Sequence, residues 1–126
     1  MTQKVVAVVD DDLCLREALQ DFLESRGYAS LAYSSALEFL AASGFEQADC
    51  VLLDIEMPEM SGLELLEVSV AMKSRPPVII MSSRGDEETL LRARANGAAG
   101  IVTKPIDLEV FNSILATTLG TPAPSA

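Results

Sequence analysis

Residues 4–12 read KVVAVVDDD, a run of valines that leads directly into three consecutive aspartates. Valine favours β-strands, and an apolar run without polar alternation is typical of a parallel-sheet strand that is covered on both faces. Adjacent carboxylates repel one another and resist joint ionisation. The segment therefore predicts a buried strand that ends in carboxylates, with a positive group needed close by.

Apolar runs of this kind recur along the chain and alternate with helical patterns. The predicted strands are residues 4–10, 29–34, 50–54, 77–82 and 100–104. Apolar residues at helical spacing follow the first strand, and Gly27 occupies a position typical of a helix end. Further helices are predicted to begin after Ser35, Ser61, Asp86 and Asp107, and each serine has a glutamate three residues later, as in a capping box.

Five strands that alternate with five helices predict an α/β protein, a (βα)5 unit with right-handed crossovers and a parallel sheet. We expect one domain over residues 1–120, because the sequence has neither an internal repeat nor a break in composition. Residues 121–126, TPAPSA, carry two prolines and are expected to form a linker-like or frayed tail. Open sheets of this kind bind ligands outside the carboxyl ends of their strands.

The composition limits the possible functions. Nine Lys and Arg against nineteen Asp and Glu give a net charge of -10, which argues against direct binding of nucleic acid. No segment has membrane-spanning length and the start lacks a secretory signal, so we expect a cytoplasmic protein without membrane contact. The chain has no histidine, the usual general base and transition-metal ligand. Cys14 and Cys50 are too few for a disulfide framework, and we expect both to be small packing residues.

Polar residues gather at the predicted strand ends. The side chains expected at one edge of the sheet are Asp10, Asp11, Asp12, Asp54, Ser82, Ser83 and Lys104. Carboxylates without His or Cys suit a hard cation such as Mg²⁺, which binds one or two carboxylates together with water and phosphate oxygens. Each residue alone could merely end a strand or start a loop, but their joint placement indicates a cation site.

Four motifs, in this order and spacing, resemble the receiver domain of two-component response regulators over about residues 4–119. They are VVDDD (8–12), VLLDIEMPEMSGLELL (51–66), VIIMSS (78–83) and NGAAGIVTKP (96–105). The resemblance implies a flavodoxin-like, doubly wound fold whose five-stranded parallel sheet has the order 2-1-3-4-5.

The resemblance also implies a role for each acidic residue. Asp54 would accept a phosphoryl group from a phosphohistidine of a sensor histidine kinase or a histidine phosphotransfer protein. Asp11 and Asp54 would bind Mg²⁺, or Mn²⁺, directly, and Asp10 would act through water. The backbone carbonyl of Glu56 would add a further ligand.

Two more residues would contact the phosphoryl group by the same resemblance. Ser82 would donate a hydrogen bond to it as the switch hydroxyl, and Lys104 would pair with it. An ionised carboxylate needs no base, so the lack of histidine is no obstacle. The chain would not be a conventional enzyme, but would catalyse its own phosphorylation and a slow hydrolysis of the aspartyl phosphate. Lys104-Pro105 is a cis-peptide candidate on the resemblance, whereas the rarity of cis bonds predicts trans.

The sequence departs from the family pattern at the expected switch. Many receivers carry an aromatic residue three positions before the lysine, and here that position is Ile101, which is smaller and stiff at χ1. Ile101 and Ser82 are the switch candidates, and we expect coupling to run through the backbone of residues 82–84. Glu56 and Arg84 hold positions that in the family tune hydrolysis; they could form a lid or could both be solvated.

The resemblance implies that the output is a change of the surface formed by the fourth helix, fifth strand and fifth helix, about residues 87–119. Its partners would be a downstream effector domain or protein, or a second copy in a homodimer. A haloacid-dehalogenase-type enzyme would need an aspartate where Glu56 stands, and three aspartates would repel a flavin phosphate as a flavodoxin ligand. The alternative that stays open is a degenerate receiver, a protein interaction module that works without phosphate.

Overall fold

The computed structural model describes residues 3–57, 59–72, 74–83 and 87–120. The strands are β1 (Val5–Val9), β2 (Ala29–Tyr33), β3 (Cys50–Asp54), β4 (Val78–Ser82) and β5 (Gly100–Thr103). The helices of this part of the chain are α1 (Leu13–Ser25), α2 (Ala36–Ala41), α3 (Gly44–Gln47), α4 (Gly62–Ser69), α5 (Glu87–Ala95) and α6 (Leu108–Leu119). Each predicted strand is present at its expected place. Among these helices, none has the length and apolar character needed to cross a membrane.

The five strands form one parallel sheet in the order β2-β1-β3-β4-β5. The doubly wound fold and the strand order implied by the resemblance are therefore confirmed. The order reverses between β1 and β3, and Val9 near the end of β1 lies opposite Leu53 near the end of β3. A reversal of this kind is where open α/β sheets place their ligands.

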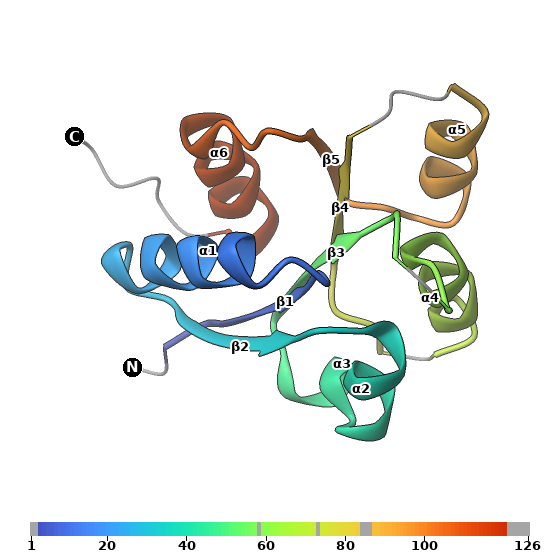
Figure 1. The fold of residues 1–126 in the computed structure, drawn as a ribbon, viewed down its shortest axis with the longest axis horizontal. Coiled ribbons are helices and arrows are strands. Elements are labelled where there is room, and N and C mark those ends of the chain that lie inside the picture. The colour runs from blue at the N-terminus through green and yellow to red at the C-terminus, as the bar shows by residue number, and fades with distance from the viewer. Residues whose placement is uncertain (1–2, 58, 73, 84–86, 121–126) are drawn as a thin grey trace.

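Helices cover both faces of the sheet. Figure 1 shows α1 and α6 on one face and α2 to α5 on the other. Successive strand residues alternate between the two faces, so Val6 and Val8 of β1 pack with α1 and α6, while Ala7 and Val9 pack on the opposite side. All residues of β3 and β4 are buried, which explains why these strands show no polar alternation.

Side-chain caps fix the starts of the helices. Ser61 accepts a hydrogen bond from the Glu64 N–H and the Glu64 carboxylate accepts one from the Ser61 N–H, so this capping box is complete. Ser35 and Asp107 cap α2 and α6 as predicted. Asp12 caps α1, a role that the sequence analysis did not assign to it. The predicted cap Asp86 lies outside the described residues.

The segment between β2 and β3 differs from the prediction of a single helix. α2 ends early and α3 follows as a separate short helix, with Ser43 in the left-handed region at φ 56°. The break lets the rings of Phe39 and Phe45 pack edge to face with their centroids 4.7 Å apart. The prediction for Cys14 is also wrong, because this residue is exposed on α1, whereas Cys50 is buried in β3 as expected.

Candidate functional site

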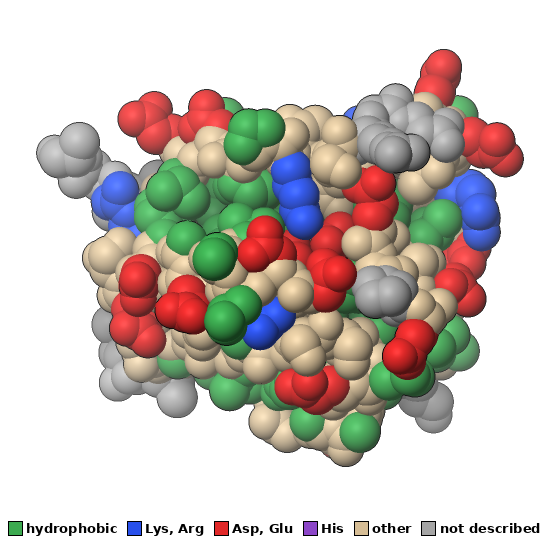
Figure 2. All heavy atoms as spheres, in the orientation of Figure 1, with side chains coloured by type: hydrophobic (Ala, Val, Ile, Leu, Met, Phe, Trp, Pro, Cys, Tyr) green, Lys and Arg blue, Asp and Glu red, His purple; other side chains and the backbone are tan. Residues whose placement is uncertain are grey.

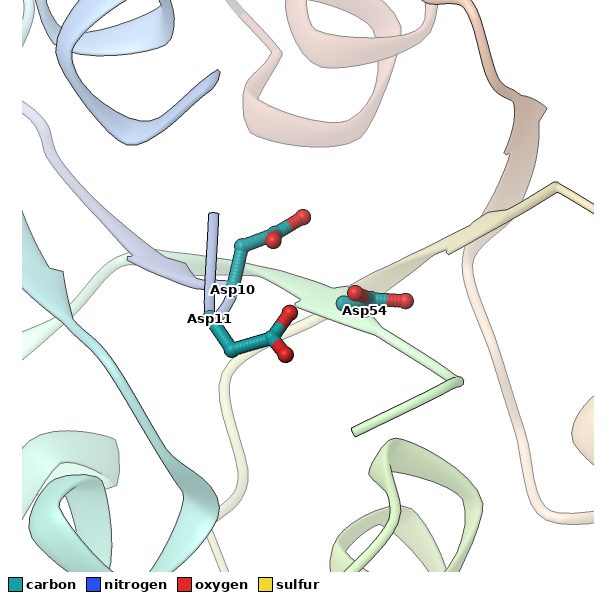
Figure 3. Close-up of side chains that lie close together, drawn as sticks. All are labelled: Asp10, Asp11 and Asp54. Atoms are coloured by element: carbon teal, nitrogen blue, oxygen red, sulfur yellow. The ribbon is translucent and has the colours of Figure 1, made fainter. Parts of the chain in front are cut away.

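Three carboxylates converge where β1 and β3 end. Asp10 follows β1 and is fully buried, and Asp54 is the last residue of β3 and is only 2% exposed. Asp11 is exposed, and its carboxylate lies with those of Asp10 and Asp54 so that one oxygen of each falls within 4.8 Å of the others. Figure 3 shows these three side chains at the adjacent ends of the two strands.

Lys104 supplies the positive group that the aspartate run requires. It follows β5, and its Nζ lies 2.8 Å from Asp10 Oδ2 and 3.0 Å from Asp54 Oδ2. The Lys104 N–H also donates to the carbonyl of Ser82 at 2.8 Å, which ties the β5 end to the β4 end. The peptide bond between Lys104 and Pro105 is cis, as the resemblance implied, whereas the rarity of cis bonds predicted trans.

The environment shifts the pKa of both partners of this ion pair. Burial raises the pKa of Asp54 above its ordinary 3.8, although hydrogen bonds from the Glu56 N–H and from Lys104 partly oppose the rise and Asp10 adds to it. Burial lowers the pKa of Lys104, but its bonds to Asp10 and Asp54 outweigh this and raise it above 10.5. The lysine therefore stays protonated at neutral pH, and ionisation of Asp54 is less favourable than that of a free aspartate.

Backbone N–H groups orient the carboxylates of Asp10 and Asp54. Asp10 Oδ1 accepts from the Asp12 N–H at 2.8 Å, and Asp54 Oδ1 accepts from the Glu56 N–H at 2.9 Å.

The guanidinium of Arg16, in the first turn of α1, donates to the Asp10 carbonyl at 2.8 Å. The sequence analysis missed Arg16, because its role depends on the helix placing it over the end of β1. Asp12 lies beside the three carboxylates but serves as the α1 cap, a role that its place before an apolar helix could have indicated.

The remaining predicted residues that the structure describes lie on the loop after β3, at the end of β4 and in β5. Ser82 is buried at the end of β4, and Ile101 of β5 is half-buried against the core on the α2 to α5 side. Glu56 is exposed, and its carboxylate accepts hydrogen bonds from the N–H and hydroxyl of Ser83. Arg84, the other predicted lid residue, lies outside the described residues.

Gly62 brings the start of α4 against the phosphorylation candidate. A Cβ at this position would fall inside contact distance of the backbone oxygen of Asp54 and of the Ile55 Cα. The Gly62 N–H also donates to the Ile55 carbonyl at 3.3 Å. The close approach of α4 to the end of β3 thus depends on the absence of a side chain at Gly62.

An apolar hollow opens beside the acidic cluster. It has a volume of about 600 Å³ and lies between α1 and the segment from β5 to α6. Leu15, Leu19 and Ile106 line it, and Lys104 and Ser83 stand at the end that borders the carboxylates. Figure 2 shows acidic side chains near the middle of this face with a basic side chain among them and an apolar area alongside. A partner that reaches Asp54 from this side would meet both charge and apolar surface.

The donor set fits a hard divalent cation. Asp10, Asp11 and Asp54 offer only oxygen ligands within a space that one ion can bridge, which suits Mg²⁺ and gives no reason for a soft metal. The buried Asp54 carboxylate is paired with the Lys104 ammonium group, and the buried Ser82 ends the neighbouring strand, an arrangement that suits the binding of an anionic group at Asp54.

The fold and this pocket define a doubly wound α/β protein with an acidic, lysine-containing site at its strand ends. The sequence profile of the response regulator receiver domain matches residues 6–116. The chain therefore belongs to the receiver domain family of two-component response regulators.

Individual relatives agree with this family. The chain is 37% identical over 115 residues to the transcriptional regulatory protein FixJ of Azorhizobium caulinodans, a match that covers 91% of this chain and 54% of FixJ. A response regulator receiver protein from Burkholderia phymatum has a similar structure, with a TM-score of 0.84, 32% identity and coverage of 98% of this chain and 100% of that one. The chemotaxis protein CheY4 of Vibrio cholerae gives a TM-score of 0.84 at 26% identity and covers 94% and 100% of the two chains. The chain spans about half the length of the FixJ relative.

Proposed function

We propose that this chain is a phosphorylation-activated switch that takes a phosphoryl group onto Asp54 from a phosphohistidine of a sensor kinase or a phosphotransfer protein. The observation that carries the proposal is the pairing of the buried Asp54 carboxylate with Lys104 Nζ at 3.0 Å, inside a cluster of oxygen ligands. The family membership supports the same chemistry.

The proposed reaction is an in-line displacement at phosphorus. An oxygen of the Asp54 carboxylate attacks, a new O–P bond forms, and the N–P bond to the donor imidazole breaks with its electron pair on nitrogen, which then takes up a proton. Lys104 would neutralise an equatorial oxygen and Ser82 would donate a hydrogen bond to another. Water attack on the same phosphorus would later release inorganic phosphate and restore Asp54.

Asp10, Asp11, Asp54 and the Glu56 carbonyl would hold the Mg²⁺ or Mn²⁺ ion of this reaction. When bound, the ion supplies positive charge to the phosphoryl oxygens and offsets the repulsion among the aspartates. Asp11 and Asp54 would be direct ligands of this ion, Asp10 would act through water, and Lys104 would pair with the phosphoryl group on Asp54.

The output surface would be the one formed by α5, β5 and α6, which are the fourth helix, fifth strand and fifth helix of the prediction because α3 adds one to the count. Leu91 on α5 and Val110 on α6 are 59% and 51% exposed, and apolar side chains of this kind suit a protein interface. An effector domain or protein, or a second copy, would bind there after phosphorylation. Residues 1–120 would form this receiver unit, with 121–126 as a linker-like or frayed tail.

Intact mass after incubation with acetyl phosphate tests the proposal. We expect a Mg²⁺-dependent gain of one phosphoryl group on the wild type and none on Asp54→Ala. The degenerate alternative, an interaction module without phosphate chemistry, predicts no adduct and no Mg²⁺ binding. An adduct that persists on Asp54→Ala would place the acceptor elsewhere.

A further inference from the structure

Glu56 and Ser83 join two loops beside Asp54. Glu56 lies on the loop after β3, and its Oε1 accepts hydrogen bonds from the Ser83 N–H at 2.9 Å and from the Ser83 hydroxyl. Ser83 directly follows β4, so the contact connects the carboxyl end of β3 with the carboxyl end of β4. We call this pair of bonds the Glu56–Ser83 clasp.

The clasp is linked to the phosphorylation candidate. The N–H of Glu56 donates to Asp54 Oδ1 at 2.9 Å while its side chain accepts from Ser83. Ser83 also lines the same hollow as Lys104, whose Nζ lies 3.0 Å from the other Asp54 oxygen. The N–H and the hydroxyl of Ser83 thus lie at the edge of the site, where both already donate to the Glu56 carboxylate.

We propose that the Glu56 carboxylate is an internal anion that holds the donors of Ser83 in the unphosphorylated protein, and that a phosphoryl group on Asp54 competes for them. This inference rests on the proposed function. A phosphoryl group brings about -1.5 to -2 charges and three acceptor oxygens. It would repel the nearby Glu56 carboxylate and offer Ser83 a better acceptor, so Ser83 would exchange one anion for another.

The exchange has two consequences for the switch. Loss of the clasp would free the β4 end to move toward Asp54, and this end leads into α5 of the output surface. The Glu56 carboxylate would also oppose phosphorylation, because its bonds to Ser83 must break before the phosphoryl group gains them. Its removal should therefore favour the phosphorylated state.

Binding of beryllofluoride in the presence of Mg²⁺ measures this competition, because the complex mimics a phosphoryl group on aspartate. Titration calorimetry on Glu56→Ala should give a dissociation constant lower than that of the wild type by about three- to tenfold, the range expected for one hydrogen bond. Glu56→Gln keeps a neutral acceptor and should fall between the two.

Glu59→Gln is the matched control. It removes one negative charge from the same loop at an exposed position and leaves the clasp intact. Its dissociation constant should stay within about twofold of the wild type, because exposed charges are screened by solvent. The Ser83→Ala variant lacks the hydroxyl donor. In this variant, loss of the Glu56 carboxylate should increase the affinity for beryllofluoride less than it does in the wild type.

The amide resonance of Ser83 provides a readout that needs no phosphoryl mimic. In the apo protein it should shift in Glu56→Ala and stay in place in Glu59→Gln, with circular dichroism to show that both variants fold. A wild type that binds beryllofluoride with the same affinity as Glu56→Ala would overturn the clasp and leave the proposed function standing. A wild type that binds none would overturn both.

Discussion

Asp54 is a carboxylate that the fold buries before any ligand arrives. It is 2% exposed, and burial raises its pKa even though Lys104 and a backbone N–H bind it. A buried carboxyl with a raised pKa favours the protonated form, so its ionisation works against folding. The site therefore holds the ionised Asp54 carboxylate at some cost to stability, which a bound cation would offset.

Replacement of Asp54 by asparagine should stabilise the metal-free protein. The folded pKa lies above the unfolded value near 3.8, so the stability contribution is complete below that pH and is lost as pH rises toward the folded pKa. Above the folded pKa the wild type bears this cost in full and Asp54→Asn does not. We expect a Tm increase of several degrees, equivalent to about 1 kcal/mol, in a thermal melt without Mg²⁺.

Asp11→Asn is the control for this melt, because Asp11 is exposed and its neutralisation should change the Tm less. A metal-free Asp54→Asn that melts at or below the wild type would mean that the pairing of Asp54 with Lys104 outweighs its burial.

The two cysteines should differ sharply in reactivity. The Cys50 thiol is buried in β3, and burial raises its pKa to about 12, so almost no thiolate forms at mildly alkaline pH. Cys14 is exposed on α1. A thiol-disulfide reagent should therefore modify one cysteine in the folded protein and both after unfolding. Cys14→Ser should show no reaction until it unfolds, and a fast reaction of that folded variant would contradict the burial of Cys50.

The residues of the site were largely predictable because they lie at the end of a strand or directly after it. A buried apolar run that stops at a charged residue indicates a strand end, and parallel strands bring such ends to one edge of the sheet. Arg16 and the Glu56–Ser83 clasp were not predictable in this way. Both depend on the direction of a long side chain from a helix or loop, which neither periodicity nor strand position specifies.

At the scale of elements, the turn from β3 into α4 is the tightest part of the site. Gly62 lies against the backbone of Asp54 and Ile55, so any side chain there must displace the strand end that carries Asp54. The complete capping box of Ser61 and Glu64 fixes the helix start at the same place. The position of Asp54 is thus coupled to the first turn of α4.

Gly62→Ala should impair folding and the site together. We expect a loss of about 1–3 kcal/mol in the free energy of unfolding, as for overpacking of a tight contact, and a slower phosphorylation of Asp54 by acetyl phosphate. Gly27→Ala is the matched control: Gly27 has φ 87° but no atom within 4 Å of an added Cβ, and it lies far from the site in sequence and fold. It should lose about 1–2 kcal/mol from backbone strain and keep the wild-type phosphorylation rate.

Equal phosphorylation rates for Gly62→Ala and the wild type would show that Asp54 does not depend on the first turn of α4. Urea denaturation and the intact-mass time course give the two quantities independently.

The helices were less predictable than the strands. Capping residues before apolar patterns correctly gave the starts of α2, α4 and α6, since a cap is a local hydrogen bond. The break between α2 and α3 depends on how Phe39 packs with Phe45, and the Ser43-Gly44 pair was the available local signal for a turn. The extra helix shifts the numbering of the later helices but leaves the sheet and the site unchanged.

At the scale of the whole molecule, the site joins both halves of the core. Asp10 and Lys104 follow β1 and β5, and Asp54 ends β3. These strands lie in the central sheet, which carries core residues on both faces, so a ligand that bridges the three side chains is attached to the layer that both core clusters share. The unfolded chain has no such arrangement. An ion that binds only the folded state therefore stabilises the entire domain by mass action.

Mg²⁺ should raise the Tm of the wild type by several degrees, with a gain of about 2.7 kcal/mol when the free ion reaches a hundred times its dissociation constant. Because the net charge is -10, any salt will also reduce the self-repulsion of the folded chain, and the comparison must be made at equal ionic strength with Na⁺. Asp11→Asn retains the Lys104 pair with Asp10 and Asp54 but loses an exposed ligand, so its melting temperature should respond to Mg²⁺ only as it does to Na⁺. If Na⁺ raised the Tm of the wild type as much as Mg²⁺ does, the stabilisation would come from screening of the acidic surface, and the three aspartates would not form a specific cation site.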